Sequence, residues 1–373
     1  MRIFCEKDVL AAGLTMVQRA VAAKSPLPSL KGILLTARDN QLTLSATDLE
    51  FGLSCTFTSQ CEENGSIVLP ARMLTDFVRR LPAGHVTLAS DEGNPNLINV
   101  RSGSIKFDLT GFPAEEFPQL PGLKNIDQAK IFSISEGLLR EMLVQTEVAL
   151  AREETRPILT GMLMELDEQR IKLVATDGHR LAFRQTVAEL GEITRKAVIP
   201  GKVVSELVKI LNQDFEKKIE VSLGESDVVF KTGILTLSSR LMDGKYPPYQ
   251  QIIPSDFKTS VTADGKELVA ALERAEVISR EGGNNLVRLE MDEMGIRINA
   301  SSPDVGSMDE HLPASVQGET LSITFNVRLL LDSLKNLGSE KVSLDFTGSF
   351  SPALFKPIHD HNCLHLVLPV RLN

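Results

Sequence analysis

The sequence predicts an α+β protein built from three repeated modules, each with two helices packed on antiparallel β-sheet. The length of 373 residues exceeds the roughly 250–300 residues that a single hydrophobic core supports. A pattern of helices and strands also recurs three times along the chain, and such a repeat defines the architecture. The expected modules span residues 1–125, 126–254 and 255–373, each with its helices on one side of the sheet.

An amphipathic helix near the start of each module is the first recurring element. Apolar residues at i, i+3, i+4 and i+7 mark KDVLAAGLTMVQRAV from Lys7, EGLLREMLVQTEVAL from Glu136 and KELVAALERAEVIS from Lys266. Two strands with a polar turn between them follow each helix: GILLTARDNQLTLSATDLEFGL, GMLMELDEQRIKLVATDGHRLAF and VRLEMDEMGIRINASSPDVGSM.

A short strand leading into a second helix is the other recurring element. It is predicted in SIVLPARMLTDFVRRLP, KAVIPGKVVSELVKIL and LSITFNVRLLLDSLKNL. Closing strands follow, and the first two modules end in the proline-containing segments IKFDLTGFPAEEFPQLP and LTLSSRLMDGKYPPYQQIIP. These prolines indicate an exit from each module and a linker.

Composition narrows the function. A net charge of −9 disfavours a protein that grips nucleic acid over its whole surface, so any DNA contact is expected to be local or topological. Tryptophan is absent and aromatics are 5%, which leaves few stacking platforms for single strands. Four cysteines without a Cys-x-x-Cys pair favour reduced thiols. The N-terminus lacks the apolar stretch of a secretory signal, so we expect a cytoplasmic protein.

Basic residues occur at matched positions on the second helix of every module. They lie seven residues apart and share one helix face: Arg72 and Arg79, Lys202 and Lys209, Arg328 and Lys335. One interpretation is a solvated helix with i, i+4 ion pairs, namely Arg72/Asp76, Lys202/Glu206 and Arg328/Asp332. The other is a basic surface that faces a phosphate backbone.

Helix packing distances favour a dimer if DNA passes through the assembly. A closed circle of twelve helices, packed roughly 8–10 Å apart, leaves an opening of roughly 21–28 Å. The six helices of one chain leave only about 5–9 Å. Passage of a duplex therefore requires a second copy.

Several longer motifs are specific to one family. They are SATDLE at Ser45 to Glu50, VLPAR at Val68 to Arg72, ETRPILTGM at Glu154 to Met162 and VATDGHRLA at Val174 to Ala182, followed by FPAEEFPQLP, MDGKYPPY, FNV and LPVRL. On these motifs the whole chain resembles the bacterial sliding clamp family, the beta subunit of DNA polymerase III.

The resemblance implies a DNA clamp fold, in which one chain forms half of a six-module ring. It implies a head-to-tail homodimer with helices lining the hole, which encircles double-stranded DNA without sequence preference. The clamp would be a non-catalytic processivity factor without a cofactor, and tethering would raise the local concentration of polymerase. Polymerase subunits, the clamp loader and repair factors would bind through short linear peptide motifs.

The resemblance places a peptide-binding groove between the second and third modules. Its deep part would be Leu159, Thr176, Gly178, His179, Arg180, Leu181, Pro247, Leu366 and Leu368. Its shallower part would be Asn326, Phe350, Pro352, Pro369, Val370 and Arg371. An apolar slot with a few polar groups suits a peptide with hydrophobic anchors. Leu329 and Gln251 depart from the family pattern, which puts the preferred peptide in question. The sequence also continues one residue beyond the usual Arg-Leu ending, to Asn373.

The resemblance also implies residues for ring closure and for DNA. Phe107 and Leu109 would meet Val277 and Ile278 of a second copy, with Lys106 and Arg101 nearby to meet acidic partners; core packing is the alternative for the four apolar residues. The phosphate-contacting residues would be Lys24, Arg72, Arg79, Arg152, Lys202 and Lys209.

Two constellations leave an enzymatic alternative open. Asp177 and His179 are residue types of general acid/base catalysis, although Asp-Gly among strands is more often a turn. His359, His361, Cys363 and His365 alternate and would share one strand face as metal ligands, or would form a polar strand face. The alternative function is a metal-dependent hydrolase that uses this strand. We expect no metal, because the clamp family requires none there.

Overall fold

The computed structural model describes residues 1–22, 24–122, 130–153, 155–167, 169–190, 193–281 and 283–371. Contacts divide the chain into two compact units. Unit 1 comprises Met1–Gly137 and Lys209–Leu241, and unit 2 comprises Leu138–Val208 and Met242–Asn373. The predicted module boundary after residue 125 and the terminal Asn373 lie outside the described residues.

Unit 1 contains two complete helices, α1 (Lys7–Val17) and α2 (Ala71–Arg80). Its strands are β1 (Arg2–Glu6), β2 (Gly32–Arg38), β3 (Gln41–Thr47), β4 (Phe51–Thr58), β5 (Gln60–Glu63), β6 (Gly65–Pro70), β7 (His85–Ser90), β8 (Leu97–Ser102), β9 (Ile105–Thr110), β10 (Phe112–Pro113), β11 (Lys130–Ser135), β16 (Lys218–Leu223), β17 (Asp227–Thr232) and β18 (Leu235–Arg240). Helix α3 (Glu136–Glu147) starts in this unit and α4 (Gly201–Ile210) ends in it.

Two antiparallel sheets build unit 1. One has the strand order β5-β1-β7-β8-β9, and the other has the order β10-β6-β2-β3-β4-β18-β17-β16-β11. The larger sheet is continuous because β18 pairs with β4, with Leu237 opposite Leu53. Strands from the first two predicted modules therefore share one sheet.

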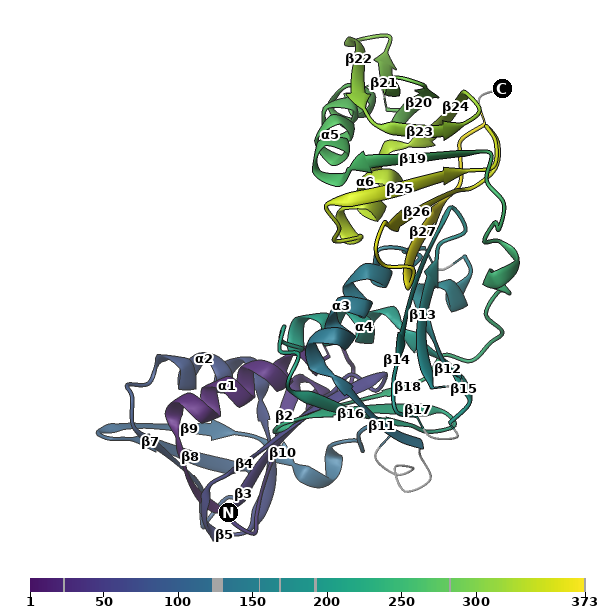
Figure 1. Ribbon diagram of the computed structural model, residues 1–373. Helices are drawn as coiled ribbons and strands as arrows, with labels where there is room; N and C mark the ends of the chain where they lie inside the picture. Colours follow the sequence, from purple (N-terminus) through teal and green to yellow (C-terminus); the bar gives the residue numbers. More distant parts are fainter. Residues whose placement is uncertain are drawn as a thin grey trace. The chain divides into compact units, whose positions relative to one another are not determined.

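The core of unit 1 forms beneath its helices, which lie side by side in Figure 1. The amphipathic spacing buries Leu10 and Leu14 of α1, and Leu74 and Val78 of α2. Burial of such a stripe is the main source of stability for a surface helix. The polar sides of these helices remain available for contacts.

Unit 2 contains most of α3 and α4 together with α5 (Gly265–Glu281) and α6 (Val327–Asn336). Its strands are β12 (Gly161–Asp167), β13 (Arg170–Thr176), β14 (Arg180–Val187), β15 (Arg195–Pro200), β19 (Thr259–Asp264), β20 (Leu286–Asp292), β21 (Gly295–Ser302), β22 (Gly306–Pro313), β23 (Ser315–Gly318), β24 (Leu321–Asn326), β25 (Lys341–Phe346), β26 (Ala353–Pro357) and β27 (Cys363–Val367).

A second nine-stranded sheet organises unit 2, with the order β15-β12-β13-β14-β27-β26-β25-β19-β23. It is continuous because β14 pairs with β27, with Leu181 opposite Leu366. A four-stranded sheet, β22-β21-β20-β24, completes the unit. Helices α5 and α6 lie side by side against these sheets (Figure 1), over a core that includes Phe325 and Phe355 in edge-to-face contact.

The predicted elements are confirmed in type and order. Helices occupy all six predicted positions, and each is accompanied by antiparallel strands. The α+β prediction is therefore correct. No helix in the described part of the chain combines the length and hydrophobicity that a membrane span needs.

Candidate functional site

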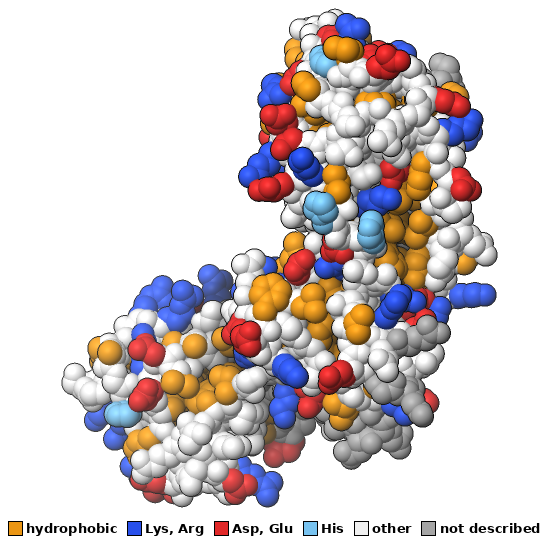
Figure 2. All heavy atoms as spheres, viewed as in Figure 1, with side chains coloured by type: hydrophobic (Ala, Val, Ile, Leu, Met, Phe, Trp, Pro, Cys, Tyr) orange, Lys and Arg blue, Asp and Glu red, His pale blue; other side chains and the backbone are white. Residues whose placement is uncertain are grey.

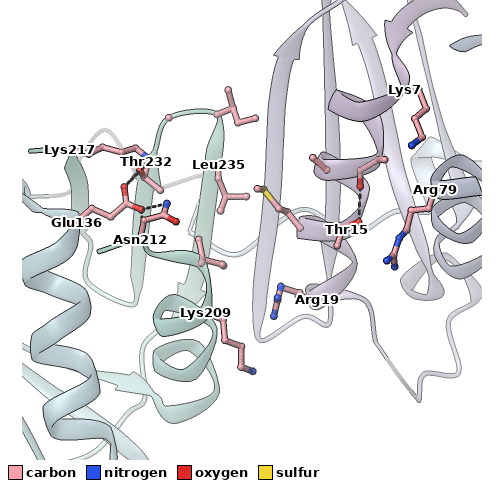
Figure 3. Close-up of a pocket in the computed structure, with 16 residues that line it drawn as sticks. Lys7, Thr15, Arg19, Arg79, Glu136, Lys209, Asn212, Lys217, Thr232 and Leu235 are labelled. Atoms are coloured by element: carbon pink, nitrogen blue, oxygen red, sulfur yellow. Dashed lines mark hydrogen bonds and ion pairs between the residues drawn. The ribbon is translucent and has the colours of Figure 1, made fainter. Parts of the chain in front are cut away.

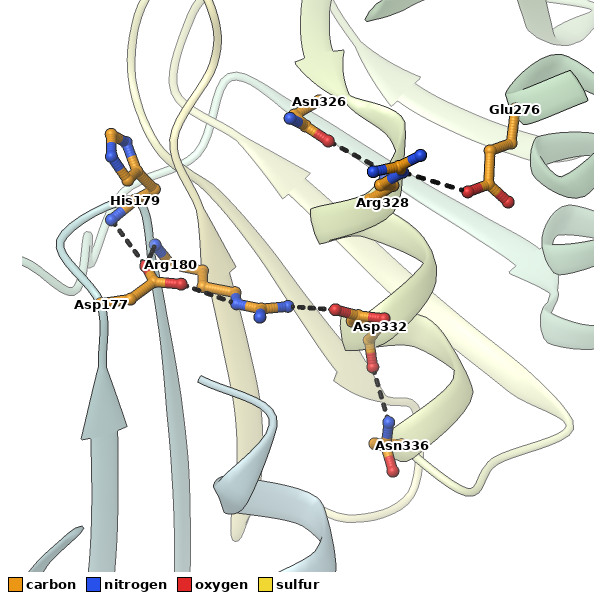
Figure 4. Close-up of polar contacts among 8 residues, drawn as sticks. All are labelled: Asp177, His179, Arg180, Glu276, Asn326, Arg328, Asp332 and Asn336. Carbon is orange, nitrogen blue, oxygen red and sulfur yellow. Dashed lines mark hydrogen bonds and ion pairs between the residues drawn. The ribbon is translucent and has the colours of Figure 1, made fainter. Parts of the chain in front are cut away.

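A tight turn between β13 and β14 contains several of the predicted groove residues (Figure 4). Asp177 Oδ1 accepts hydrogen bonds from the backbone N–H groups of His179 at 2.8 Å and Arg180 at 3.0 Å. Thr176 Oγ1 donates to the backbone carbonyl of Arg180 at 2.7 Å. Gly178 has φ +90, a backbone conformation that glycine adopts without strain. The predicted turn at Asp177 and Gly178 is confirmed.

Arg180 joins this turn to helix α6. Its Nε donates to Asp177 Oδ2 at 3.0 Å and its Nη1 donates to Asp332 Oδ2 at 2.9 Å. The Arg180 residue is only 6% exposed. Because a buried guanidinium is costly unless it is paired, two carboxylates with good geometry are the arrangement expected here.

The predicted i, i+4 pair between Arg328 and Asp332 is wrong. Asp332 instead accepts from Arg180, while Arg328 Nε lies 3.4 Å from Glu276 Oε1 on α5 (Figure 4). Arg328 and Asp332 pair with other elements because an i, i+4 ion pair on a helix surface stabilises the protein by only about 0.2–0.5 kcal/mol. The corresponding pair on α2 does form, with Arg72 Nε 3.8 Å from Asp76 Oδ2.

The predicted groove residues divide into a buried base and an accessible margin. Leu181 and Leu366 are buried in one apolar cluster with Leu354 and Tyr249, and Leu159 is also buried. The accessible or half-accessible group is Gly178, His179, Pro247, Asn326, Phe350, Pro352, Leu368, Pro369, Val370 and Arg371. Phe350, at 66% exposed, is the most accessible large apolar side chain in this group.

The chain segment after β27 runs beside the turn and β24. The Leu368 N–H donates to the His179 carbonyl at 2.9 Å, and the Val370 N–H donates to the Thr324 carbonyl at 2.8 Å. Backbone hydrogen bonds thus place Leu368 next to the turn and Val370 next to β24. This arrangement brings predicted groove residues that are distant in sequence into one neighbourhood.

A pocket of about 610 Å³ lies beside this neighbourhood. Of the predicted groove residues it is lined by Leu159, Gly178, His179, Arg180 and Asn326. The others are not part of its lining, namely Thr176, Leu181, Pro247, Phe350, Pro352, Leu366, Leu368, Pro369, Val370 and Arg371.

The other residues of this pocket were not predicted as groove residues. Arg152, predicted to contact DNA, lines it, as do Arg156 and Asp332, which were not predicted as site residues. Arg156 lies within the family-specific ETRPILTGM motif, and this motif could have identified it as a site residue. Leu329, one of the departures from the family pattern, also lines it.

Unit 1 contains a strongly basic pocket of about 840 Å³ (Figure 3). Two predicted DNA residues, Arg79 of α2 and Lys209 of α4, line it together with Lys7, Arg19 and Lys217. The side chains of Lys7 and Arg19 were missed: Lys7 begins α1, and Arg19 lies in the 3-10 turn Gln18–Ala20 directly after it. The structure thus adds α1 to the predicted basic surface.

Glu136 neutralises one of these cations. Its carboxylate is fully buried and lies 2.8 Å from Lys217 Nζ, and it accepts from the Asn212 backbone N–H at 2.9 Å and from Thr232 Oγ1 at 3.0 Å (Figure 3). Burial alone would raise the pKa of Glu136, but the hydrogen bonds from Lys217, Asn212 and Thr232 outweigh it and lower this pKa. The carboxylate is therefore ionised at neutral pH, and the negative charge of Glu136 is directed at Lys217.

The remaining residues predicted to contact DNA are exposed, but they do not all line one pocket. The Arg72 side chain is 90% exposed on α2, and Figure 2 shows Lys and Arg side chains gathered above this helix. Lys24 is exposed in the loop after α1, and Lys202 is exposed on α4. The structure brings Arg79 and Lys209 together and leaves Arg152 at the pocket of unit 2.

The residues predicted for ring closure lie on an edge strand of unit 1 and on helix α5 of unit 2. Strand β9 ends the five-stranded sheet and carries Lys106, Phe107 and Leu109, next to Arg101 of β8. Leu109 is buried, whereas Phe107 is half-buried. On α5, Val277 is 55% exposed and Ile278 packs partly against the core.

An apolar patch that was not predicted adjoins β9. Phe77 of α2 stacks on Phe107 with ring centroids 3.6 Å apart. Met73, Phe77 and Ile105 line a hollow of about 460 Å³ and are exposed. Met73 and Phe77 are apolar residues at i, i+4 on α2, outside the buried stripe of Leu74 and Val78. This second apolar pair could have indicated the exposed patch from the sequence.

The proposed metal-binding strand does not form as predicted. Strand β27 begins only at Cys363, while His359 and His361 are exposed in the preceding turn. Asp360 Oδ1 accepts the Asn362 N–H at 2.9 Å, which stabilises a turn in place of the alternating strand. Burial lowers the pKa of His365 to about 4 and raises the pKa of Cys363 to about 12. The described residues contain no group of three or more metal-ligand side chains placed to bind a metal ion.

Comparison with family models gives successive matches along the chain. The DNA polymerase III beta subunit N-terminal domain matches residues 1–121, the central domain matches residues 133–248 and the C-terminal domain matches residues 250–371. The chain belongs to the DNA polymerase III beta subunit family. The Asp177–Arg180 turn lies in its central domain, and α6 and the segment after β27 lie in its C-terminal domain.

Individual relatives agree with this membership. The beta sliding clamp of Bacillus subtilis (strain 168) is 34% identical over 382 residues, covering 100% of both chains. The beta sliding clamp of Staphylococcus aureus (strain Mu50 / ATCC 700699) is 31% identical over 380 residues, covering 100% of this chain and 99% of the relative.

Solved structures of relatives superpose along the full chain. The DNA polymerase sliding clamp from Bacillus subtilis has a TM-score of 0.95 at 33% identity, and the DNA polymerase III subunit beta from Pseudomonas aeruginosa has a TM-score of 0.94 at 30% identity. Both matches cover 100% of each chain. The clamp fold expected from the sequence is confirmed.

Proposed function

We propose that this chain is the DNA sliding clamp of its host, a non-catalytic processivity subunit of the replicative DNA polymerase. The observation that carries the proposal is the succession of three beta-subunit domain matches along the chain. They support the predicted modules 1–125, 126–254 and 255–373 as the repeating units of the ring. The metal-dependent hydrolase alternative has no support, because its strand of ligands is interrupted before Cys363.

The clamp is proposed to close as a head-to-tail homodimer around double-stranded DNA. The β9 edge of one copy would meet α5 and the edge strand β22 of a second copy, because unpaired strand edges readily accept another strand. Phe107, with Phe77 stacked on it, would contact Val277 and Ile278. Lys106 and Arg101 would meet acidic side chains. On β22, Asp309 and Glu310 pair with Arg297 and Arg274 of their own unit, so they would have to share or exchange these partners.

Partner proteins are proposed to dock short peptides beside the Asp177–Arg180 turn. The exposed Phe350 and Leu368 supply apolar contacts, and the turn and Asn326 supply polar ones. Polymerase subunits, the clamp loader and repair factors would use this groove, which consists of the predicted residues given above. A fluorescein-labelled peptide with two neighbouring leucines is a suitable probe, because an apolar slot favours hydrophobic anchors. A Pseudomonas aeruginosa relative is described as bound to griselimycin, and competition with the peptide tests whether griselimycin binds at this groove.

DNA is proposed to contact the basic residues of α1, α2 and α4 through its phosphates. The variant Arg79→Gln/Lys209→Gln is expected to weaken binding equally for all sequences. Each lost phosphate contact reduces the slope of log K against log salt by about 0.9, so the slope should fall by about 2. Fluorescence anisotropy of labelled duplexes across a salt series measures it.

The matched control for this variant is Arg38→Gln/Lys231→Gln. It removes two exposed basic residues of the same unit that do not line the basic pocket. An unchanged slope in Arg79→Gln/Lys209→Gln, or an equal fall in the control, would contradict a phosphate-contacting role for Arg79 and Lys209.

Small-angle X-ray scattering across a dilution series tests the assembly. We expect a particle of twice the chain mass with a hole wide enough for a duplex, because one chain supplies only half of the helices that such a hole needs. A compact monomer or a filled dimer at micromolar concentration would refute the ring. We place the protein in the cytoplasm, where bacterial DNA is replicated.

A further inference from the structure

Arg180 is a buried cation held between carboxylates from two different parts of the fold. Asp177 belongs to its own turn, whereas Asp332 lies on α6, distant in sequence (Figure 4). The Asp332 side chain is 46% exposed, in contrast to 7% for Arg180. Asp332 is thus the accessible end of a buried polar link.

The ion pairs of Arg180 connect two parts of the proposed groove, the Asp177–Arg180 turn and helix α6. The turn side presents Gly178 and His179, and the His179 carbonyl also holds Leu368 at 2.9 Å. The α6 side begins at Asn326, whose Oδ1 accepts the Arg328 N–H at 3.0 Å as the helix N-cap. The position of the turn relative to α6 therefore determines how these groove residues face one another.

Asp332 fixes that position through geometry as well as charge. A guanidinium has a planar, fixed arrangement of donors, so Nε and Nη1 can satisfy both carboxylates only in one orientation. Asp177 is itself committed to the turn through two backbone N–H groups. Loss of Asp332 leaves a buried N–H donor without its partner, and such groups are expensive to leave unpaired.

We propose that Asp332 is a positioning residue for peptide docking, which acts through Arg180 to hold the Asp177–Arg180 turn against α6. The inference rests on the proposed peptide groove and assigns to it a residue outside the predicted set. It also concerns specificity. With both carboxylates present, the single positive charge of Arg180 is more than balanced, so the groove should favour neutral anchors over acidic ones at this point.

The test measures peptide affinity in the full-length protein. Asp332→Asn is expected to bind the fluorescein-labelled dileucine peptide about tenfold more weakly, the scale found for residues that modulate a site without contacting its ligand. Asp332→Glu, which keeps the carboxylate, should recover part of this loss. A peptide with an acidic residue beside the leucines should lose less affinity than the neutral one, because a neutral amide replaces one of the two carboxylates that face Arg180.

Glu276→Gln is the matched control. It breaks the Arg328 ion pair, which also involves α6 but does not touch Arg180. The thermal unfolding midpoints of both variants, compared with the wild type, show whether weaker peptide binding reflects a general loss of stability or a local change at the groove. Hydrogen exchange provides a second readout, since the amides of His179, Arg180 and Leu368 should exchange faster in Asp332→Asn and stay unchanged in Glu276→Gln.

Affinities within twofold of one another for the wild type, Asp332→Asn and Glu276→Gln would overturn the positioning role while leaving the groove intact. An equal loss in Asp332→Asn and Glu276→Gln would also overturn it, because the effect would then belong to α6 in general. A wild-type protein that does not bind the peptide would refute the groove itself, and the positioning role with it.

Discussion

Deletion of residues 369–373 is expected to abolish stimulation of the polymerase while leaving the fold intact. The deletion begins after β27, so Leu366 and Val367 keep their buried positions in the sheet. It removes Pro369, Val370 and Arg371 from the proposed groove, together with the hydrogen bond from Val370 to Thr324. The deletion removes a continuous stretch of the surface on which the peptide would dock, so it should remove binding rather than weaken it slightly.

Primer extension on a long single-stranded template, with the clamp loader present, measures this effect as product length. Scattering on the same preparation shows whether the dimer persists. The control is His359→Ala/His361→Ala, which changes two exposed side chains of the turn before β27 and should leave stimulation unchanged. Normal stimulation by the truncated protein combined with loss in the histidine variant would refute the clamp mechanism.

The helices could be predicted from the sequence because their signal is local. The buried stripes of α1 and α2, such as Leu10 with Leu14 and Leu74 with Val78, repeat at helical spacing, and this spacing is visible without knowledge of any partner. The same holds for the turn at Asp177, where a short acidic side chain and a glycine specify the local backbone.

The junctions of the sheets could not be predicted in this way. Leu53 of β4 lies opposite Leu237 of β18, and Leu181 of β14 lies opposite Leu366 of β27. Each strand has an ordinary alternating pattern, and nothing in it identifies a partner far away in sequence. Three repeats were therefore visible, whereas the two units into which the contacts divide the chain were not.

The errors at the candidate sites have the same origin. Arg328 and Asp332 have ideal i, i+4 spacing, yet the buried Arg180 has greater need of the Asp332 carboxylate. His359 and His361 continue the alternation of β27, but Asp360 caps a turn there. Tertiary contacts override the local pattern where pairing a buried charge, or capping a turn, stabilises the fold more than the local interaction would.

Val277→Asp is expected to convert the dimer into a monomer. Val277 is 55% exposed in the single chain, so an aspartate there is hydrated and should cost the monomer little stability. In the proposed dimer it would face Phe107, where the charge would be buried without a partner. Such central interface residues contribute about 2–4 kcal/mol, which corresponds to weakening of dimerisation by about 30- to 1,000-fold.

Sedimentation equilibrium across a concentration series measures this change directly. Met294→Asp is the matched control, because Met294 is 72% exposed in the same unit but lies in the turn between β20 and β21 and is not one of the proposed contact residues. It should remain dimeric with wild-type affinity. Phe77→Asp should act in the same direction as Val277→Asp, since Phe77 supports Phe107 by stacking. If Val277→Asp stays dimeric with wild-type affinity, α5 is not part of the closing interface and another surface must complete the ring.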